Sequence, residues 1–415
     1  MDRAAAAPPL WRNRDFLLLW SGQLVSFTGT QVSQLAVPLL VLALTGSPAQ
    51  AGLVAAVRSV PMLIVVLPAG AWLDRWDRKR TMILCDLVRS LALASVPFCL
   101  LAPPTLILPL LAMVSLIEGA LGTLFSVAQN ACLPRVVGRD QISQALSANS
   151  LANQVGGMVG PWLGGVLYAA SQVLPFVADA ASYAVSVLSL VLVRAPFQAA
   201  RTERVTTNLR YDIVEGWRWL LGQPLLRSLV GLVGGLTLCS FGDPLILVVR
   251  AQELGADART IGLLFASGPV GGVLGALVAP LLIRRFALGP LAIVSAWVWV
   301  LTWIPYALAP SLAWLAVVNL ASWINVPLFG AVPSSYRSAA VPDRMQGRVS
   351  SVYRLVTVGS QPFSLALTGL LLSSFGAVTT ILLITLPQLL LVALVSFSPT
   401  VRNAPHLSAV AAAND

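Results

Sequence analysis

The stretch that decides the fold is Gly70-Ala-Trp-Leu-Asp74-Arg75-Trp-Asp77-Arg78-Lys79-Arg80, in which six residues are charged. Apolar runs flank it, over residues 50–73 before it and residues 81–102 after it. A helix needs about 20 mainly apolar residues to cross a bilayer. The pattern therefore predicts two membrane-spanning helices joined by a short, charged, water-facing loop.

Composition extends this prediction to the whole chain. The 415 residues are 57% hydrophobic and only 10% charged, whereas soluble domains carry about 25% charged residues. So few charges cannot cover a water-facing surface, and we predict a polytopic all-α membrane protein. Twelve segments are long and apolar enough to span, six in each half: residues 16–43, 50–73, 81–102, 106–130, 145–169, 173–194, 225–249, 260–283, 288–309, 311–333, 350–374 and 377–399.

The distribution of arginine predicts the orientation. Most basic residues lie in loops that alternate with nearly uncharged ones, and cytoplasmic loops of membrane proteins carry the excess of Lys and Arg. Both termini and the middle connection are therefore expected in the cytoplasm. The net charge of +10 is explained by this topology and by contacts with anionic membrane lipid, so no nucleic-acid partner is expected.

The predicted domains are an N-terminal six-helix bundle (1–194), a cytoplasmic amphipathic linker (195–224), a C-terminal six-helix bundle (225–399) and a cytoplasmic tail (400–415). In the linker, apolar residues recur at helical spacing, which predicts a helix at the inner membrane surface. A shift of 205 residues weakly relates the halves, because it places Lys79-Arg80 on Arg284-Arg285 and Gly164 on Gly369.

The charged loop resembles the signature between the second and third helices of the major facilitator superfamily: glycine, three residues, Asp-Arg, two residues and a basic cluster. The matching positions are Gly70, Asp74, Arg75, Arg78, Lys79 and Arg80. The resemblance implies two pseudo-symmetric six-helix bundles that transport by alternating access, with this loop latching the halves on the cytoplasmic side. Arg348 and Arg354, at the start of the eleventh helix, are our inferred partners for Asp74.

The fifth predicted helix resembles the signature of the exporters, or antiporters, of that superfamily. It has the pattern Gly-x-x-x-Gly-Pro-x-x-Gly-Gly, and the matching residues are Gly156, Gly160, Pro161, Gly164 and Gly165. The glycines open a groove for a facing helix, and the proline favours a kink. Generic packing of small residues is the alternative interpretation.

Glu118 lies near the middle of the fourth predicted helix. A charge at the bilayer centre costs about 2.5–3.5 kcal/mol, so this carboxyl should face a cavity or a partner. Proton-coupled drug exporters of the superfamily often carry Arg three residues before Gln-Gly here, whereas this chain has Ser115 and then Glu118-Gly119. Two roles stay open: Glu118 carries the coupling proton, or it forms an ion pair with Arg58 at similar depth.

Other intramembrane charges have simpler interpretations. Asp86 and Arg89 are spaced for a local pair on one helix, Asp179 is another candidate partner of Arg58, and Asp243-Pro244 favours a helix break. Helices 1, 4, 7 and 10 line the cavity in the resembled fold. This makes four uncharged polar residues on helices 1 and 10 candidate substrate contacts: Gln31, Gln34, Asn319 and Asn325.

Several short segments resemble the branch of macrolide-efflux and enterobactin exporters, among them Trp11-Arg-Asn-Arg-Asp-Phe16 and Asp179-Ala-Ala-Ser-Tyr183. The resemblance implies export but does not identify the cargo. We expect a monomeric exporter in the bacterial inner membrane that is driven by a proton gradient and carries an amphipathic small molecule, such as a drug or siderophore. A lipid or lysolipid flippase and a non-transporting membrane sensor are the alternatives.

No enzyme, cofactor or metal site is predicted. The sequence has no Walker loop, so ATP hydrolysis is not the expected energy source. Its one histidine is His406 in the tail, and its four cysteines are scattered without a Cys-x-x-Cys pair, which disfavours a metal centre or a disulfide framework.

Overall fold

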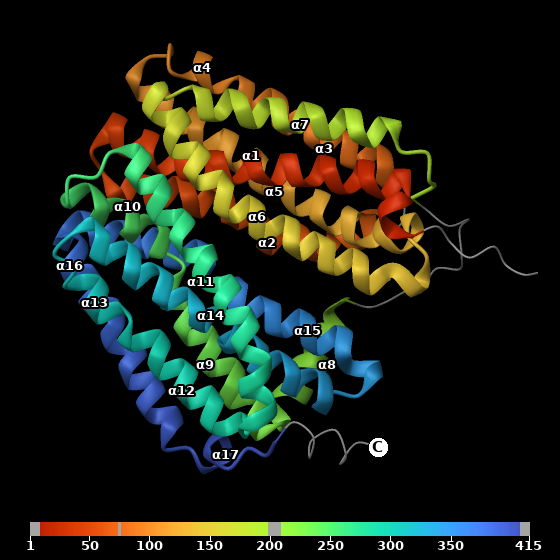
Figure 1. Cartoon of the computed structure of the whole chain (residues 1–415), viewed down its shortest axis with the longest axis vertical. Coiled ribbons are helices and arrows are strands. Elements are labelled where there is room, and N and C mark those ends of the chain that lie inside the picture. Colours follow the sequence, from red (N-terminus) through yellow and green to blue (C-terminus); the bar gives the residue numbers. More distant parts are fainter. Residues whose placement is uncertain (1–8, 74–75, 198–208, 407–415) are drawn as a thin grey trace, which may run out of the picture. The chain divides into compact units, whose positions relative to one another are not determined.

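The computed structural model describes residues 9–73, 76–197 and 209–406, and these residues form helices without any strand (Figure 1). Two short 3-10 helices are η1 (Leu10–Arg12) and η2 (Arg139–Gln141). The α-helices are α1 (Arg14–Thr45), α2 (Pro48–Leu73), α3 (Arg78–Ala94), α4 (Val96–Cys99), α5 (Pro104–Val136), α6 (Ile142–Ala170), α7 (Leu174–Leu192), α8 (Leu209–Gly222), α9 (Pro224–Ser240), α10 (Asp243–Glu253), α11 (Ala258–Arg285), α12 (Leu288–Leu301), α13 (Trp303–Ala307), α14 (Leu312–Ala340), α15 (Asp343–Val358), α16 (Gln361–Ser396) and α17 (Pro399–Arg402).

Each of the twelve predicted spans coincides with helix, and four of them are broken in two. The breaks separate α3 from α4, α9 from α10, α12 from α13, and α15 from α16. A proline lies within the first three residues after each break: Pro97, Pro244, Pro305 and Pro362. Proline lacks the backbone N–H that would continue the ladder, so it is tolerated at the start of the second piece. The predicted break at Asp243-Pro244 is confirmed.

By length and apolar composition, ten stretches of the described residues could cross a membrane. One of them, Met345–Ser396, is 52 residues long and contains the predicted boundary between the last two spans. Gly376 interrupts the helix there with φ of 72°, a left-handed conformation that glycine adopts without steric cost. Helix α6 of the exporter signature is not among the ten.

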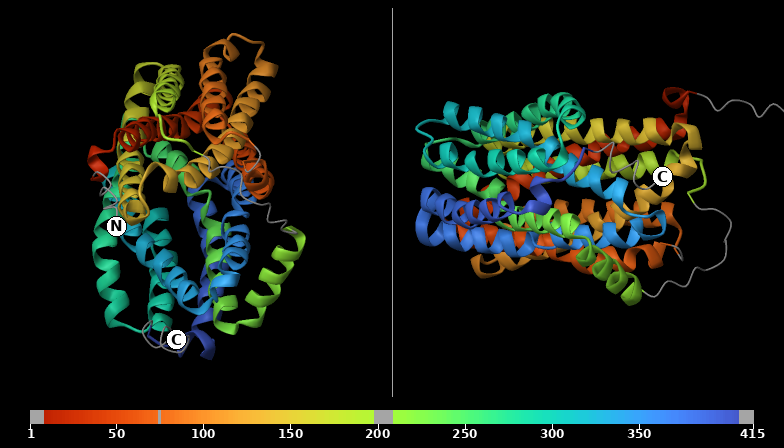
Figure 2. Two further views of the ribbon diagram at one scale, coloured as in Figure 1. Left: turned by 90° about the vertical axis from the view of Figure 1, so that its right-hand side faces the viewer. Right: turned by 90° about the horizontal axis from the view of Figure 1, so that it is seen from below.

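The helices of the chain group into two compact units. Unit 1 consists of Met1–Gly46, Val57–Glu203 and Asp257–Ala266, and unit 2 consists of Ser47–Ala56, Arg204–Ala256 and Ser267–Asp415. In unit 1, α1 packs against α6 and α7, and α3 packs against α5 and α7 (Figure 1). In unit 2, α9 packs against α15 and α16, and α12 packs against α14 (Figure 2).

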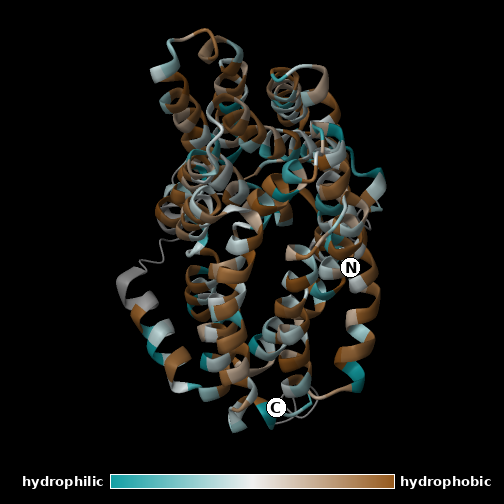
Figure 3. Cartoon of the chain, turned by 90° about the vertical axis from the view of Figure 1, so that its left-hand side faces the viewer, coloured by the Kyte–Doolittle hydropathy of each residue, from teal (hydrophilic) through white to brown (hydrophobic). Residues whose placement is uncertain are grey.

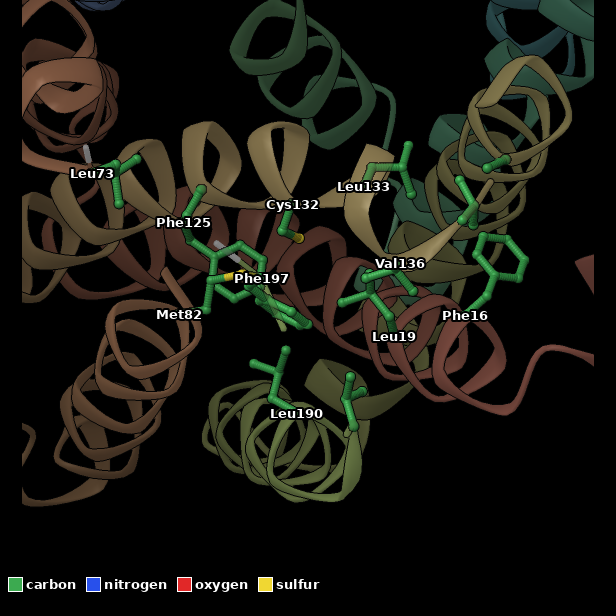
Figure 4. Close-up of a cluster of buried hydrophobic side chains, with 14 of the residues drawn as sticks. Phe16, Leu19, Leu73, Met82, Phe125, Cys132, Leu133, Val136, Leu190 and Phe197 are labelled. Atoms are coloured by element: carbon green, nitrogen blue, oxygen red, sulfur yellow. The ribbon is translucent and has the colours of Figure 1, made fainter. Parts of the chain in front are cut away.

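An apolar core cluster of unit 1 lies at the ends of α1, α2, α3, α5, α6 and α7 and in the residues after α7. Phe125, Met82 and Phe197 gather at its centre, and Phe16 and Val136 lie farther along it (Figure 4). Polar contacts beside this core join the helix ends. Asn13 accepts hydrogen bonds from the backbone N–H groups of Asp15 and Phe16 and donates to the Val136 carbonyl at 2.9 Å. This cap fixes the start of α1 against the end of α5.

Large apolar side chains also cover the outside of the helices. Hydrophobic colour extends along most of the helical ribbons in Figure 3, and side chains such as Phe98, Leu394 and Phe397 are 72%, 71% and 83% exposed. Soluble proteins do not expose continuous apolar surface of this kind. These faces are suited to contact with lipid chains.

The predicted linker contains α8, which packs on α15 within unit 2. Leu220 is buried in a cluster with Val349 and Val352 of α15, while Trp217 and Leu221 stay about half exposed. Glu215 of α8 pairs with Arg348 of α15. Helix α8 therefore packs on α15 through one face and one ion pair. Its place at the membrane surface stays a prediction.

Candidate functional site

A cluster of buried charged and hydroxyl side chains lies inside unit 1, where five helices meet. Its carboxyl groups are 0–4% exposed, and Arg89 is 6% exposed. In chain order its members are Thr30 and Ser33 of α1, Arg58 of α2, Asp86 and Arg89 of α3, Glu118 of α5, and Asp179, Ser182, Tyr183 and Ser186 of α7.

One oxygen of Glu118 is the meeting point of the cluster. Its Oε2 atom lies 3.3 Å from Arg89 Nη2 and 3.9 Å from Arg58 Nη2, and it accepts a 3.0 Å hydrogen bond from the Tyr183 hydroxyl. The pairing of Glu118 with Arg58 that the sequence left open is therefore present. Sequence reasoning missed the stronger partners, Arg89 and Tyr183.

Tyr183 connects α7 to three other helices. Its hydroxyl accepts a hydrogen bond from Arg89 Nη2 and lies 2.9 Å from the Thr30 hydroxyl, while its ring lies 4.0 Å below the Arg89 guanidinium carbon. A guanidinium over an aromatic face is stabilised by the ring quadrupole. Because Tyr183 is 0% exposed, each of these polar contacts forms away from water.

Arg89 also makes the predicted local pair. Its Nη1 atom lies 3.3 Å from Asp86 Oδ1, and the other Asp86 oxygen accepts a 2.6 Å hydrogen bond from Ser186 of α7. One arginine thus holds a carboxylate on its own helix and another on α5. Removing one partner of a buried pair leaves an uncompensated charge, which is strongly destabilising.

Close helix contact brings Arg58 beside Glu118. Gly119 follows Glu118, and a Cβ atom added there would meet the backbone carbonyl of Arg58. Small residues allow helices in membranes to approach closely in this way. Arg58 is less enclosed than its charged neighbours, since its side chain is 21% exposed, against 3% for Glu118 and 7% for Arg89.

A small cavity adjoins this pair. Side chains of six helices line it, among them Ser33, Arg58, Ser115, Glu118 and Phe176. The centre of a water-sized sphere can occupy about 10 Å³ of it, which is room for roughly one water molecule. The cavity is suited to a water beside the charges and is far too small for a drug-sized ligand.

The exporter signature on α6 packs against α1 within unit 1. A Cβ on Gly156 would lie 2.6 Å from the Phe27 ring, and one on Gly164 would lie 2.9 Å from the Val32 carbonyl oxygen. Gly160 faces Gln31 and Thr28 in the same way, and Gly165 faces Gly262 at the start of α11. The glycines therefore line a groove that a neighbouring helix occupies, as the signature implied.

The basic cluster of the charged loop binds helix ends within unit 1. Arg78 Nη1 donates to the carbonyl of Ala131 in the last turns of α5 at 3.1 Å, and Lys79 Nζ donates to the carbonyl of Val193 after α7 at 2.7 Å. Cations are favourable at helix C-termini, where carbonyls lack partners. Sequence reasoning gave these residues only a role between the halves, and it missed this local bracing.

The rest of the predicted latch is only partly described. Asp74 and Arg75 lie outside the described residues, as do the surroundings of Gly70. Arg80 and Arg354 are exposed, and Arg348 pairs with Glu215 as noted above. The latch therefore stays a prediction.

The four predicted substrate contacts differ in their surroundings. Gln34 is exposed and Gln31 is half-buried on α1. Asn319 is 3% exposed, accepts from the Tyr306 hydroxyl at 2.9 Å and donates to Ser267 at 3.0 Å, while Asn325 donates to the Ser295 carbonyl at 2.8 Å. In unit 2 the two asparagines thus already hold helices together.

Comparison with known proteins agrees with this arrangement. Residues 4–414 match the family described as transmembrane secretion effectors. The chain belongs to this family of the major facilitator superfamily. It is a multi-pass membrane transporter of the efflux branch and not an enzyme.

Two characterised relatives cover most of the transporter. It is 28% identical to the multidrug efflux pump Tap of Mycolicibacterium fortuitum over 411 residues, which are 93% of this chain and 96% of Tap. It is 26% identical to the enterobactin exporter EntS of Salmonella typhimurium, over 85% of this chain and 84% of EntS.

Solved structures share the fold at low identity. The nucleoside transporter NupG superposes with a TM-score of 0.76 at 13% identity, over 92% of this chain and 98% of NupG. A bacterial homologue of the iron transporter ferroportin, in its inward-facing state, gives 0.72 at 16% identity, over 93% of this chain and all of that homologue. The major facilitator fold predicted from the sequence is confirmed.

Proposed function

We propose that this transporter is a secondary active exporter of amphipathic small molecules, drug or siderophore in class, that works by alternating access and proton antiport. The observation that carries the proposal is the buried charge cluster of unit 1, because ionisable residues inside a membrane are expensive and typically mark ion or proton pathways. The two relatives, named as a multidrug pump and an enterobactin exporter, support the direction of transport and the class of cargo.

For Glu118, the contacts favour the role of ionised partner over that of proton carrier. Two guanidinium groups and a phenol hydroxyl surround one of its oxygens, and such contacts stabilise the charged form of a carboxyl. In this role Glu118 positions Arg58 and Arg89, and the proton binds elsewhere in the cluster.

Substrate is proposed to contact the polar residues of α1 and α14. Gln34 and Gln31 are the better candidates, since the amides of Asn319 and Asn325 already have partners within unit 2. A drug-sized ligand needs a pocket far larger than the cavity beside Glu118. Its binding site is therefore distinct from the charge cluster.

The proposed location is the bacterial inner membrane, with both termini and residues 195–224 in the cytoplasm. The asymmetry of arginine between the two sets of loops supports this orientation. Anionic lipid is the expected neighbour of those arginines, and the working unit is a monomer.

An efflux panel tests the function. The full chain is expressed in a bacterial host that lacks its own drug pumps, and susceptibility and efflux are measured for cationic dyes, macrolides and a catechol siderophore. Export that collapses when a protonophore is added supports the proposal. Export of lysophospholipid alone would replace it with the flippase, and transport that survives loss of the proton gradient would exclude antiport with protons.

A further inference from the structure

Asp179 differs from the other two carboxyl groups of the cluster. It lies on α7 and is 0% exposed, and none of the ion pairs among the described residues includes it. Its Oδ1 atom accepts one hydrogen bond from Ser182, at 3.1 Å. Among the described residues its Oδ2 atom is buried without a hydrogen-bond partner, as is Oε1 of Glu118, but the other oxygen of Glu118 faces two guanidinium groups. The Ser182 hydroxyl is bonded to this Asp179 carboxyl and the Ser33 hydroxyl acts on it. Two neutral hydroxyl groups without an ion-pair partner are weak compensation for burying a charge.

The charges of the cluster do not balance when every group is ionised. Asp86, Glu118 and Asp179 contribute three negative charges, whereas Arg58 and Arg89 contribute two positive charges. Glu118, Arg89 and Arg58 are the charged groups that act on Asp179 from α5, α3 and α2.

Within the part of the chain that the structure describes, the remaining neighbours of Asp179 supply no further cation. From α1, Gly29 faces the carboxyl, since a Cβ added there would lie 2.6 Å from Asp179 Oδ1. Helix α6 carries no ionisable group except the Tyr168 hydroxyl, and α7 adds only Tyr183. Among the described residues no three acidic, His or Cys side chains are grouped to hold a metal ion. A proton on one of the three carboxyl groups would remove the excess negative charge.

We propose that Asp179 is the residue that binds the coupling proton, while Asp86 and Glu118 stay ionised as fixed partners of Arg58 and Arg89. A proton from water on one side of the membrane adds to the Asp179 carboxylate to give the neutral acid. It leaves to water on the other side and restores the carboxylate. That this proton is coupled to transport rests on the proposed function, whereas proton binding at Asp179 rests on the geometry alone.

Two aspartates provide a matched pair of variants. Asp179→Asn replaces a neutral acid by a neutral amide of the same shape, so folding stability should be unchanged at neutral pH. Asp86→Asn, equally buried at 0% exposure, removes the carboxylate that pairs with Arg89 and should lower the melting temperature clearly. If Asp179→Asn fails to fold or melts as early as Asp86→Asn, Asp179 is ionised in the native protein and the proposal is wrong.

Infrared spectroscopy detects the proton directly. Full-length protein in lipid vesicles should show a C=O stretch of a protonated carboxylic acid at neutral pH, which disappears in alkaline buffer. The band should shift when the protein carries ¹³C-labelled aspartate and should be absent from Asp179→Asn. A band that shifts only with ¹³C-labelled glutamate would place the proton on Glu118 and overturn the proposal.

The third test is a transport assay in everted membrane vesicles, with ethidium as the transported probe. Wild-type vesicles should accumulate ethidium when a pH gradient is applied. Asp179→Asn should lose this accumulation yet keep the exchange of labelled for unlabelled ethidium. Full gradient-driven accumulation by Asp179→Asn would overturn the proposal. If wild-type protein moves no cargo in the efflux panel, the proposed function fails, but the infrared band still decides whether Asp179 binds a proton.

Discussion

At the residue scale, the Tyr183 hydroxyl joins α7 to α1, α3 and α5. Tyr183→Phe removes this one oxygen and leaves the ring under Arg89, so Glu118 loses a donor and Arg89 loses an acceptor. Interhelical hydrogen bonds in membrane proteins contribute about 0.6–2 kcal/mol, and we expect a loss of that size in unfolding free energy. Denaturant titration of the purified protein measures it.

Tyr168 provides the control for Tyr183. Its hydroxyl on α6 is also buried but has no hydrogen-bond partner among the described residues. Tyr168→Phe should therefore leave stability unchanged or raise it slightly, because it removes an unsatisfied polar atom. Equal losses in the two variants would show that the Tyr183 hydroxyl does not stabilise the cluster.

Asp257 is a residue whose contribution to stability depends on pH. It is exposed just before α11, and hydrogen bonds from the Thr260 hydroxyl at 2.6 Å and from the Thr260 backbone N–H at 2.9 Å lower the pKa of its carboxyl. Because the pKa is lower in the folded state, the stabilisation is present above the usual Asp pKa and is lost as pH falls through the lowered value.

Hydrogen exchange can detect this loss of the cap. Amides in the first turn of α11 should exchange faster, relative to their intrinsic rates, in acid than at neutral pH. Asp257→Ala should exchange fast at both pH values, because the cap is gone. A pH dependence that survives in Asp257→Ala would contradict this role.

At the element scale, the contact of α6 with α1 depends on glycines that leave no room for side chains. A Cβ at Gly164 would lie 2.9 Å from the Val32 carbonyl oxygen and 3.2 Å from its α-carbon. Both are backbone atoms, so they cannot move aside as a flexible side chain would. We expect Gly164→Val to separate the helices and to cost about 1–3 kcal/mol of stability, with less folded protein in the membrane by fluorescence-detected gel filtration.

Gly231 in the middle of α9 is the matched control, because a Cβ there would meet nothing within 4 Å. Gly231→Ala should be neutral or stabilising, since alanine favours helix more than glycine by about 1 kcal/mol. If Gly164→Val folded as well as Gly231→Ala, the groove between α6 and α1 would not be needed for packing.

At the scale of the whole molecule, Asp74 is predicted to latch the two halves in the outward-open state. Asp74→Asn should then cut transport strongly, keep expression near normal and shift the conformational balance toward inward-open. Crosslinking between the charged loop and the start of the eleventh predicted helix measures that balance. Wild-type transport with unchanged crosslinking would refute the latch.

Topology is a second property of the whole molecule. Both termini and residues 195–224 are predicted to lie in the cytoplasm. Single cysteines are therefore introduced at positions 200 and 410 of a variant that lacks the native cysteines. In intact cells they should react with a membrane-permeant maleimide and should not react with an impermeant one. A cysteine at position 255, in the opposite loop, is the control and should react with both. Reaction of either inner position with the impermeant reagent would invert the predicted orientation.

The sequence by itself determined the class of fold, because spanning helices must satisfy their backbone hydrogen bonds internally and therefore leave a local, linear signal of apolar length. It also determined the pair of Asp86 with Arg89, since i, i+3 spacing on one helix is read along the chain. The spacing of the glycines and the charged loop identified the family because both are patterns of residues close together along the chain.

Only the tertiary structure decided which helices share their buried charges. Arg89 and Tyr183 are separated from Glu118 by 29 and 65 residues along the chain, and nothing local tells which faces of α3, α5 and α7 turn toward one another. It likewise placed Lys79 on the end of α7 and, among the described residues, left Asp179 outside the ion pairs of the cluster. Side-chain partners inside a bundle depend on how the helices rotate and approach, and that is set by packing of the whole unit.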